Sequence, residues 1–267
     1  MHSWRQFFAF KKELQEKTYD VIIETQGLIK SALVCALANK SSDAVVAGLA
    51  NATEFSGYEP MARAFYNQSV QVPVQCHAVD RSRYVTCSAL DWMLIDRSET
   101  AKFYPASFID TISDMVAIGL LKPYVLFFHS TAREAKRWGN THWIELGKKL
   151  AALGYKIVLP WGSAAERVIS QELALQIPGS IVPNSFSIED AFSLIANSVL
   201  VVGVDTGLTH LSAVLSKPTV EIYCNSPRRK TEGYWSDKIQ NVGDMQAPPT
   251  VYEVSKASLE LLSGVKN

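Results

Sequence analysis

The stretch Val201–Leu215, VVGVDTGLTHLSAVL, decides the fold of this chain. It continues the apolar segment Ser198–Val204, which is rich in β-branched residues and does not alternate, as expected for a strand covered on both faces. The turn Asp205–Gly207 follows at once and leads into the helical apolar pattern of Leu208–Leu215. Open α/β sheets bind ligands at such strand ends, and a helix N-terminus there favours an anion such as phosphate. The same residues equally fit a capped helix with a surface histidine, His210.

The composition indicates a soluble globular protein of one large or two small domains. The chain has 267 residues, of which 48% are hydrophobic and 19% charged. Its 26 basic and 26 acidic residues cancel, so no global field points to nucleic acid. The four cysteines form no CxxC pair, which favours reduced thiols over zinc or disulfides. With no signal peptide and no membrane-length apolar run, we expect a cytoplasmic protein.

Strands and helices alternate along the chain. From Tyr124 onward the alternation is regular, which predicts a doubly wound parallel sheet in the second half. The first half carries a strand over Tyr19–Glu24 followed by a helix over Leu28–Ala38, and a polar, less regular linker is expected within residues 99–123. Residues 3–17 predict an amphipathic helix, which we expect to pack on its own sheet; contact with a membrane surface is the alternative.

Three polar loops of the second half each follow a predicted strand. They are His129–Trp138, Trp161–Glu166 and Asp205–His210, and in a parallel sheet they share one edge. Cations such as Lys136 suit a diphosphate, and the Glu166 carboxylate suits ribose hydroxyls. Considered alone, Lys136 is better explained as a solvated surface lysine. Glu166 fits a first-turn glutamate stabilised by the helix dipole as well as it fits a ligand-binding residue.

Several common enzyme motifs are absent. No GxGxxG follows a strand and no GxxxxGK[ST] occurs, which argues against NAD dehydrogenases and P-loop NTPases. The GxSxG elbow and HExxH are also missing.

The motifs as a set resemble those of the lipopolysaccharide heptosyltransferases, glycosyltransferase family 9. The resemblance runs through nearly the whole chain in the family's order, and the first-half motifs resemble its heptosyltransferase I branch. The motifs are YDVIIETQGLIKSAL, ARAFYNQSV, QCHAVDRSR, HSTAREAKRW, VLPWGSAAE and VVGVDTGLTHLSAVLSKPTVEIY.

This resemblance implies a fold and an activity. The fold would be α/β of the GT-B type, with two Rossmann-like doubly wound domains, the N-terminal one incomplete. They would be an acceptor-side domain over residues 1–110, a nucleotide-sugar-binding domain over 111–250, and a helix over 251–267 packing back on the N-terminal domain. The reaction would be an inverting transfer of L-glycero-D-manno-heptose from ADP-heptose to the Kdo residue of Kdo2-lipid A. It would need no metal or cofactor and would take place at the cytoplasmic face of the inner membrane.

The resemblance also assigns roles in the donor site. Thr131 and Lys136 would contact the diphosphate, and Lys136 would offset charge on the departing ADP. Glu166 would hold the ribose and Phe186 would line the adenine pocket. The family's second threonine after Thr131 is Ala132 in this chain, so one phosphate-binding hydroxyl is missing.

The turn before the Leu208 helix completes the expected donor site. Asp205 would bind the heptose hydroxyls and, with Lys136, would form the catalytic pair. Thr206 and Gly207 would offer backbone N–H groups to the phosphates, with His210 close behind.

The expected acceptor site lies in the first half, where positive charge suits the carboxylate and phosphate groups of Kdo2-lipid A. Its residues would be Gln26, Lys30, Arg63, His77 and Arg81, with Arg83 either among them or a solvated cation.

One family feature is missing from this sequence. Family members open with a strand and a Ser-x-Gly-Asp loop whose aspartate is the expected general base, and no such motif occurs here. We therefore expect a truncated chain or a misassigned start, with donor binding retained and full activity in doubt. The rival readings are a heptosyltransferase II-like enzyme with a different acceptor, and a catalytically impaired nucleotide-sugar-binding protein.

Overall fold

The structure is a computed structural model that describes residues 4–94, 123–131, 133–184 and 186–264. The chain divides into two compact units, Met1–Ile95 and Asp96–Asn267, each of which is considered by itself. The predicted boundary at residues 110/111 and most of the predicted linker lie outside the described residues.

The first unit is built on a parallel sheet with the strand order β1-β2-β3. Val21 and Ile23 of β1 pack with the buried side chains of Leu49, Val70 and Val85 to form its core. The strand β2 is longer than the Val45–Ala47 segment predicted, because its polar first half also pairs with β1. The elements are α1 (Trp4–Leu14), β1 (Thr18–Ile23), α2 (Ile29–Leu37), β2 (Asn39–Leu49), η1 (Pro60–Phe65), β3 (Gln68–Val70) and α3 (Ala78–Ala89).

Helix α1 forms as predicted but does not pack on the sheet of its unit. None of its residues is buried, and Trp4 and Phe8 are 79% and 60% exposed. The hydrogen bonds from the Gln15 side chain to the Leu37 carbonyl and from the Asn39 side chain to the Gln15 carbonyl tie Gln15, which follows the helix, to the rest of the unit. The packing expectation was therefore wrong: the aromatic side chains stack on one another instead of entering the core.

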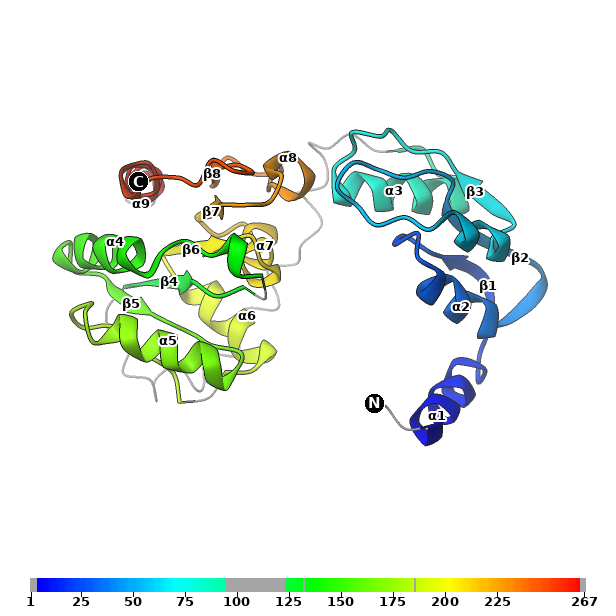
Figure 1. Ribbon diagram of the computed structural model, residues 1–267, viewed down its shortest axis with the longest axis horizontal. Helices are drawn as coiled ribbons and strands as arrows, with labels where there is room; N and C mark the ends of the chain where they lie inside the picture. Colours follow the sequence, from blue (N-terminus) through cyan, green and yellow to red (C-terminus); the bar gives the residue numbers. More distant parts are fainter. Residues whose placement is uncertain (1–3, 95–122, 132, 185, 265–267) are drawn as a thin grey trace. The chain divides into compact units, whose positions relative to one another are not determined.

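The second unit holds a five-stranded parallel sheet with the order β5-β4-β6-β7-β8 (Figure 1). Its strands β4 and β6 are buried at every position, as the unbroken apolar runs predict. The elements are β4 (Tyr124–Phe128), η5 (Glu134–Lys136), α4 (Asn140–Ala152), β5 (Lys156–Val158), α5 (Ala164–Ala174), α6 (Ile188–Asn197), β6 (Leu200–Val204), α7 (Gly207–Val214), β7 (Thr219–Tyr223), α8 (Arg228–Thr231), β8 (Ile239–Gly243) and α9 (Val251–Gly264).

Helices cover both faces of this sheet. One face packs on α4, α5 and α9, where Phe127 meets Trp143 with ring centroids 4.9 Å apart. The other face packs on α6 and α7 through side chains such as Leu194 and Leu208. This double cover confirms the doubly wound arrangement, and it leaves the carboxyl ends of the strands open to a ligand.

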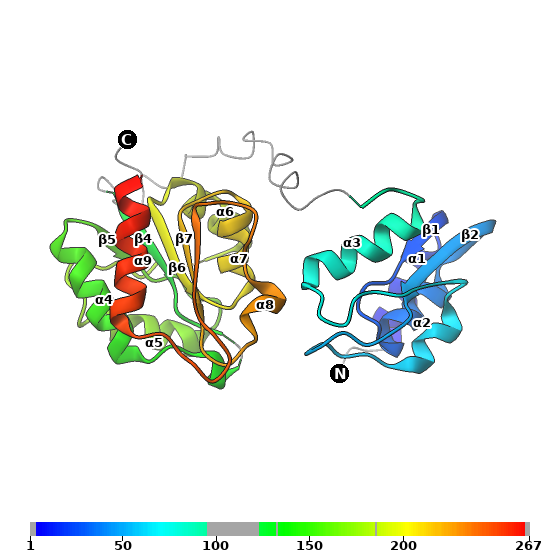
Figure 2. The same cartoon turned by 90° about the horizontal axis from the view of Figure 1, so that it is seen from above.

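Helix α9, which we expected to pack back on the N-terminal domain, contributes its buried side chains to the core of the second unit. Figure 2 shows it lying along the sheet, and its buried side chains join the core beside α4. The spacing of Val254, Ala257 and Leu261 gives it one apolar face, which the sheet covers. Strand β8 was not predicted, because its sequence IQNVG is polar and only half-buried.

Among the helices that the structure describes, none is both long enough and apolar enough to cross a membrane.

Candidate active site

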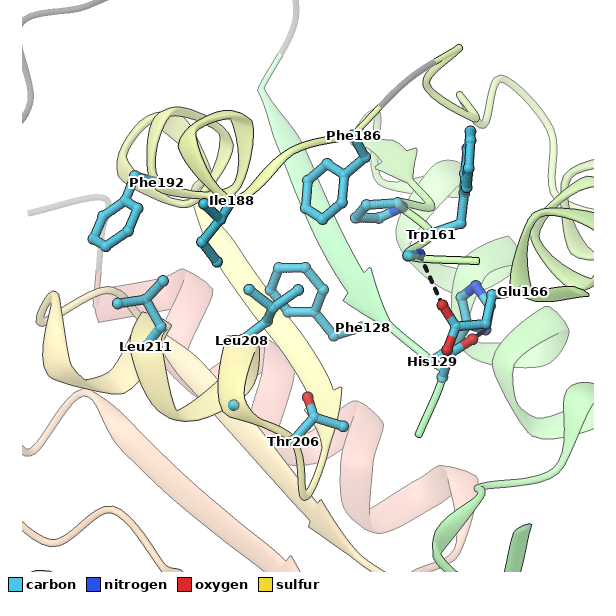
Figure 3. A pocket seen from close by; sticks show the side chains of 14 residues that line it. Phe128, His129, Trp161, Glu166, Phe186, Ile188, Phe192, Thr206, Leu208 and Leu211 are labelled. Atoms are coloured by element: carbon cyan, nitrogen blue, oxygen red, sulfur yellow. Dashed lines mark hydrogen bonds between the residues drawn. The ribbon is translucent and has the colours of Figure 1, made fainter. Parts of the chain in front are cut away.

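A cavity of about 610 Å³ opens at the carboxyl ends of β4, β5 and β6 (Figure 3). All three loops that the sequence analysis placed at this edge contribute to its wall. Its lining residues are Phe128, His129, Ser130, Pro160, Trp161, Gly162, Glu166, Phe186, Ile188, Phe192, Thr206, Gly207, Leu208 and Leu211.

One side of the cavity is apolar and the other is polar. Phe128, Phe186, Phe192 and Leu208 lie on the apolar side, and Figure 3 shows Phe186 facing Leu208 and Phe128 across the space. Such a slot suits a flat heteroaromatic ring. Phe186, expected beside the adenine, therefore lies in the part of the cavity that could take it.

Glu166 fits both roles that the sequence left open, a first-turn glutamate that stabilises its helix and a carboxylate that faces a ligand. It is the third residue of α5 and forms a capping box with Ser163. Its Oε2 accepts hydrogen bonds from the backbone N–H groups of Gly162 at 2.7 Å and Ser163 at 3.1 Å. The side chain also lines the cavity, so it is placed both to cap the helix and to face a ligand.

The turn between β6 and α7 brings a helix N-terminus to the cavity. Thr206 and Gly207 line the space, and the Thr206 side chain does not cap the helix that starts at Gly207. Thr209 instead donates its hydroxyl to the Val204 carbonyl at 2.8 Å. Gly203 makes room for this bond, because a Cβ there would lie 2.1 Å from the Thr209 hydroxyl oxygen. The first amides of α7 thus point a partial positive charge toward the cavity.

Asp205, the first residue of this turn, is the centre of a charge cluster. Its Oδ2 lies 2.5 Å from Lys136 Nζ, and its Oδ1 lies 2.9 Å from His210 Nε2. Burial raises the pKa of Asp205, but the hydrogen bonds from His210 and Lys136 outweigh burial and hold that pKa well below its ordinary value. Asp205 is therefore an anion between two cations.

His210 has a carboxylate at each ring nitrogen. Its Nδ1 lies 3.1 Å from Glu221 Oε1, opposite the bond to Asp205. Burial lowers the pKa of His210, but the hydrogen bonds with Asp205 and Glu221 reverse this effect and raise it to about 9. The imidazole is accordingly charged at neutral pH. The sequence analysis missed Glu221, although a lone carboxylate in the apolar strand TVEIY is a signal that could have singled it out.

A second histidine, His129, lies at the end of β4 behind the cavity. Its Nε2 lies 2.8 Å from the Ser170 hydroxyl and its Nδ1 3.0 Å from the Ser130 hydroxyl. Burial and the charge of Arg137 lower the pKa of His129 to about 4, so this ring is neutral. Ser130 lines the cavity whereas Thr131, the residue predicted to contact the diphosphate, is not among the lining residues. Ala132 lies outside the described residues.

The residues predicted to bind the acceptor lie in the first unit. Gln26 and Lys30 are exposed at the β1–α2 turn and on α2, and Arg63 is exposed on η1. His77 is 4% exposed and caps α3 by accepting the Val79 N–H. Arg81 follows on α3 and contacts the Thr53 hydroxyl at 3.4 Å. Arg83 pairs with Asp80 at 3.4 Å, and its side chain is only 17% exposed.

Glu24, at the end of β1, is a buried carboxylate among these residues. It accepts hydrogen bonds from the backbone N–H groups of Gln26 and Gly27 and from the hydroxyls of Ser31 and Tyr66, at 2.7 to 2.8 Å. These bonds fix the turn that presents Gln26. Within the described residues, no cluster of three or more His, Cys, Asp or Glu side chains could hold a metal ion.

Comparisons with known proteins agree with this architecture. The profile of glycosyltransferase family 9 (heptosyltransferase) matches residues 7–259. The chain is 32% identical over 254 residues to lipopolysaccharide heptosyltransferase 1 of Pseudomonas aeruginosa, covering 92% of this chain and 65% of the relative. The corresponding Escherichia coli K12 protein is 34% identical over 217 residues, covering 80% and 64%. The chain thus spans slightly less than two thirds of the length of these curated relatives.

A solved structure extends the likeness to the fold. E. coli heptosyltransferase WaaC, solved with ADP, superposes with a TM-score of 0.75 at 28% identity, covering 96% of this chain and 77% of the other. The E. coli heptosyltransferase II structure, at 21% identity and a TM-score of 0.71, supports the fold alone. The predicted GT-B fold is therefore confirmed. On its sequence and its fold, this chain belongs to glycosyltransferase family 9, the heptosyltransferases.

Proposed function

We propose that this chain transfers L-glycero-D-manno-heptose from ADP-heptose to the Kdo residue of Kdo2-lipid A. The observation that carries the proposal is the Lys136–Asp205 ion pair directly before the N-terminus of α7, where Thr206 and Gly207 line the cavity although the ion pair itself does not. A nucleotide sugar has the matching sequence of groups: a flat base, a ribose, a diphosphate and a hydroxylated sugar.

The donor would occupy the second unit in a defined direction. The adenine would enter the slot beside Phe186, and the ribose hydroxyls would meet Glu166. The diphosphate would rest against the N–H groups of Thr206 and Gly207, with Lys136 and the Thr131 hydroxyl beside it. The heptose would then reach Asp205, whose anionic carboxylate accepts hydrogen bonds from sugar hydroxyls. The E. coli WaaC structures with ADP and with an ADP-2-deoxy-2-fluoro heptose support this choice of ligand.

Transfer would proceed as one displacement at the anomeric carbon. The acceptor hydroxyl oxygen forms the new bond as the bond to the phosphate oxygen breaks, ADP leaves with the electron pair, and the hydroxyl proton passes to water. The Lys136 ammonium and the first amides of α7 face the negative charge that grows on ADP, so they stabilise the transition state more than the bound donor. Asp205 and Lys136 would be the catalytic pair.

The acceptor would use the first unit and a membrane surface. Lys30, Arg63 and Arg81 supply positive charge for the carboxylates and phosphates of Kdo2-lipid A, and Gln26 and His77 supply polar contacts. Helix α1 exposes aromatic side chains next to Lys11 and Lys12, a combination suited to the headgroup region of an anionic membrane. The protein would thus work at the cytoplasmic face of the inner membrane.

Turnover with purified acceptors tests the proposal against its rivals. The chain is incubated with ADP-heptose and either Kdo2-lipid A or the same acceptor already carrying one heptose, and ADP release is followed. We expect release with Kdo2-lipid A only. Release with the heptosylated acceptor alone would favour a heptosyltransferase II-like enzyme. Donor binding without release would favour a nucleotide-sugar-binding protein, and neither binding nor release would refute the proposal.

A further inference from the structure

Glu221 is a carboxylate in the middle of β7 with 0% of its surface exposed. Its neighbours Val220 and Ile222 point into the core shared with α9, so strand alternation turns Glu221 toward the opposite face, where α7 lies. A carboxylate withdrawn from water destabilises a protein strongly unless hydrogen bonds and an opposite charge compensate. Packing alone therefore does not explain a carboxylate at this position.

Three groups compensate this buried charge. Oε2 accepts hydrogen bonds from the Tyr223 hydroxyl at 2.7 Å and from the Gly233 backbone N–H at 2.9 Å. Oε1 lies 3.1 Å from Nδ1 of His210. Tyr223 is held as a neutral donor, because burial and the Glu221 charge raise its pKa. His210 is thus the only cation among the three partners of Glu221 described here.

From β7 to the cavity edge, the side chains alternate in charge. Glu221 faces His210, His210 faces Asp205, and Asp205 faces Lys136. We propose that Glu221 is a positioning residue for the donor site: by accepting the Nδ1 hydrogen of His210 it keeps the imidazole cationic, and that cation orients Asp205 and adds positive charge beside a bound diphosphate. The inference rests on the function proposed above.

The charge balance shows what Glu221 would contribute. Lys136, Asp205 and His210 together carry one net positive charge when His210 is protonated, and none when it is neutral. The Glu221 charge that balances the protonated ring lies at its Nδ1, away from Asp205 and Lys136, so the ring places positive charge between Glu221 and the donor site. The groups that face His210 are Asp205 from the β6–α7 turn and Glu221 from β7, with Lys136 and the Thr231 hydroxyl contacting Asp205. Loss of the Glu221 charge should thus weaken diphosphate binding only at a pH where His210 then loses its proton.

The first test is the titration of His210 by nitrogen-15 NMR of labelled histidine between pH 5 and pH 10, with His210→Gln used to assign its signal. In the wild type we expect a midpoint near 9. In Glu221→Gln the midpoint should fall by at least about one pH unit, and Glu221→Asp should recover part of the shift. The control Glu172→Gln, at an exposed position on α5, should leave the midpoint unchanged.

The second test is ADP binding by calorimetry at pH 6 and pH 8 on the same proteins. Glu221→Gln should bind ADP within about twofold of the wild type at pH 6 and about five- to tenfold more weakly at pH 8. An equal loss at both pH values would mean damage to the fold and would overturn the proposal. So would a wild-type midpoint at or below the ordinary histidine value, a result that needs no variant to fold. If the wild type bound no ADP at either pH, the proposed function and the donor-site role would both fail, while the NMR midpoints would still decide whether Glu221 controls the charge of His210.

Discussion

At the scale of single residues, the site depends on how Asp205 is held. Donors from three separate elements reach its carboxylate: Lys136 from η5, His210 from α7 and the Thr231 hydroxyl from α8. The carboxylate is only 6% exposed, so it has little water to compensate for a lost partner. Substitution of any of these donors should therefore weaken ligand binding, lower the stability of the fold, or do both.

Replacing Lys136 with glutamine should weaken ADP binding. A hydrogen bond to a charged group contributes about 1.5–3 kcal/mol, and because Lys136 also pairs with Asp205 in the free protein, we expect the lower part of that range. This corresponds to a loss of about ten- to thirtyfold in affinity, measured by calorimetry. Lys149→Gln, at an exposed i,i+4 pair with Glu145, is the matched control and should bind ADP normally. Unchanged affinity in Lys136→Gln would remove Lys136 from the donor site.

The charge of His210 should make stability depend on pH. Because its folded pKa of about 9 lies above the ordinary value, its stabilising contribution is complete below pH 6.5 and is lost as the pH rises through 9. The contribution is at most about 3 kcal/mol. We expect urea unfolding of the wild type and of His210→Gln to differ by more at pH 6 than at pH 10. A constant difference across this range would show that His210 is not charged in the folded protein.

At the scale of elements, variants of Ser163 and Glu166 can distinguish helix capping from ligand binding at the start of α5. Ser163→Ala removes the side-chain cap of α5 and should cost about 1 kcal/mol of stability with ADP affinity within about twofold of the wild type. Glu166→Gln keeps an oxygen that can accept the backbone hydrogen bonds but loses the charge. We expect it to lower ADP affinity about fivefold while costing less stability than Ser163→Ala. Urea unfolding and calorimetry on both variants check this, and the reverse pattern would make Glu166 a capping residue alone.

The elements also show what could be read from the sequence. The buried strands β4 and β6 could be predicted, because a short unbroken apolar run followed by a polar turn is typical of a buried strand in an α/β protein. Because the carboxyl ends of parallel strands share one edge, the strand pattern also predicts that the loops holding Lys136, Glu166 and Thr206 lie at one edge of the sheet. Strand β8 was missed because an edge strand needs little apolar character when only half-buried.

Other features depend on contacts that no local pattern specifies. The apolar face of α9 requires a sheet to cover it but does not say which one, and the aromatic residues of α1 suggested burial that does not occur. The bond between His210 and Glu221 joins residues on adjacent elements whose relative rotation is set by packing. Sequence reasoning therefore brought three polar loops to one sheet edge, while the charge state of His210 needed the structure.

At the scale of the whole molecule, each of the two units has its own core. We expect two unfolding transitions in differential scanning calorimetry, and ADP should raise the midpoint of one only. A ligand at one hundred times its dissociation constant stabilises its binding unit by about 2.7 kcal/mol. At the same ADP concentration, the ten- to thirtyfold weaker binding of Lys136→Gln should reduce this stabilisation to about 0.9–1.4 kcal/mol and shrink the shift accordingly. A single transition that moves as a whole would contradict independent units.

The most direct test of the central claim is a comparison of ADP-heptose and ADP binding by calorimetry in the wild type and in Asp205→Asn. If the Asp205 carboxylate holds the sugar, the wild type should bind ADP-heptose more tightly than ADP, and Asp205→Asn should lose this preference while still binding ADP. A wild type without the preference, or a variant that keeps it, would contradict the assignment of Asp205 to the heptose and with it the proposed donor site.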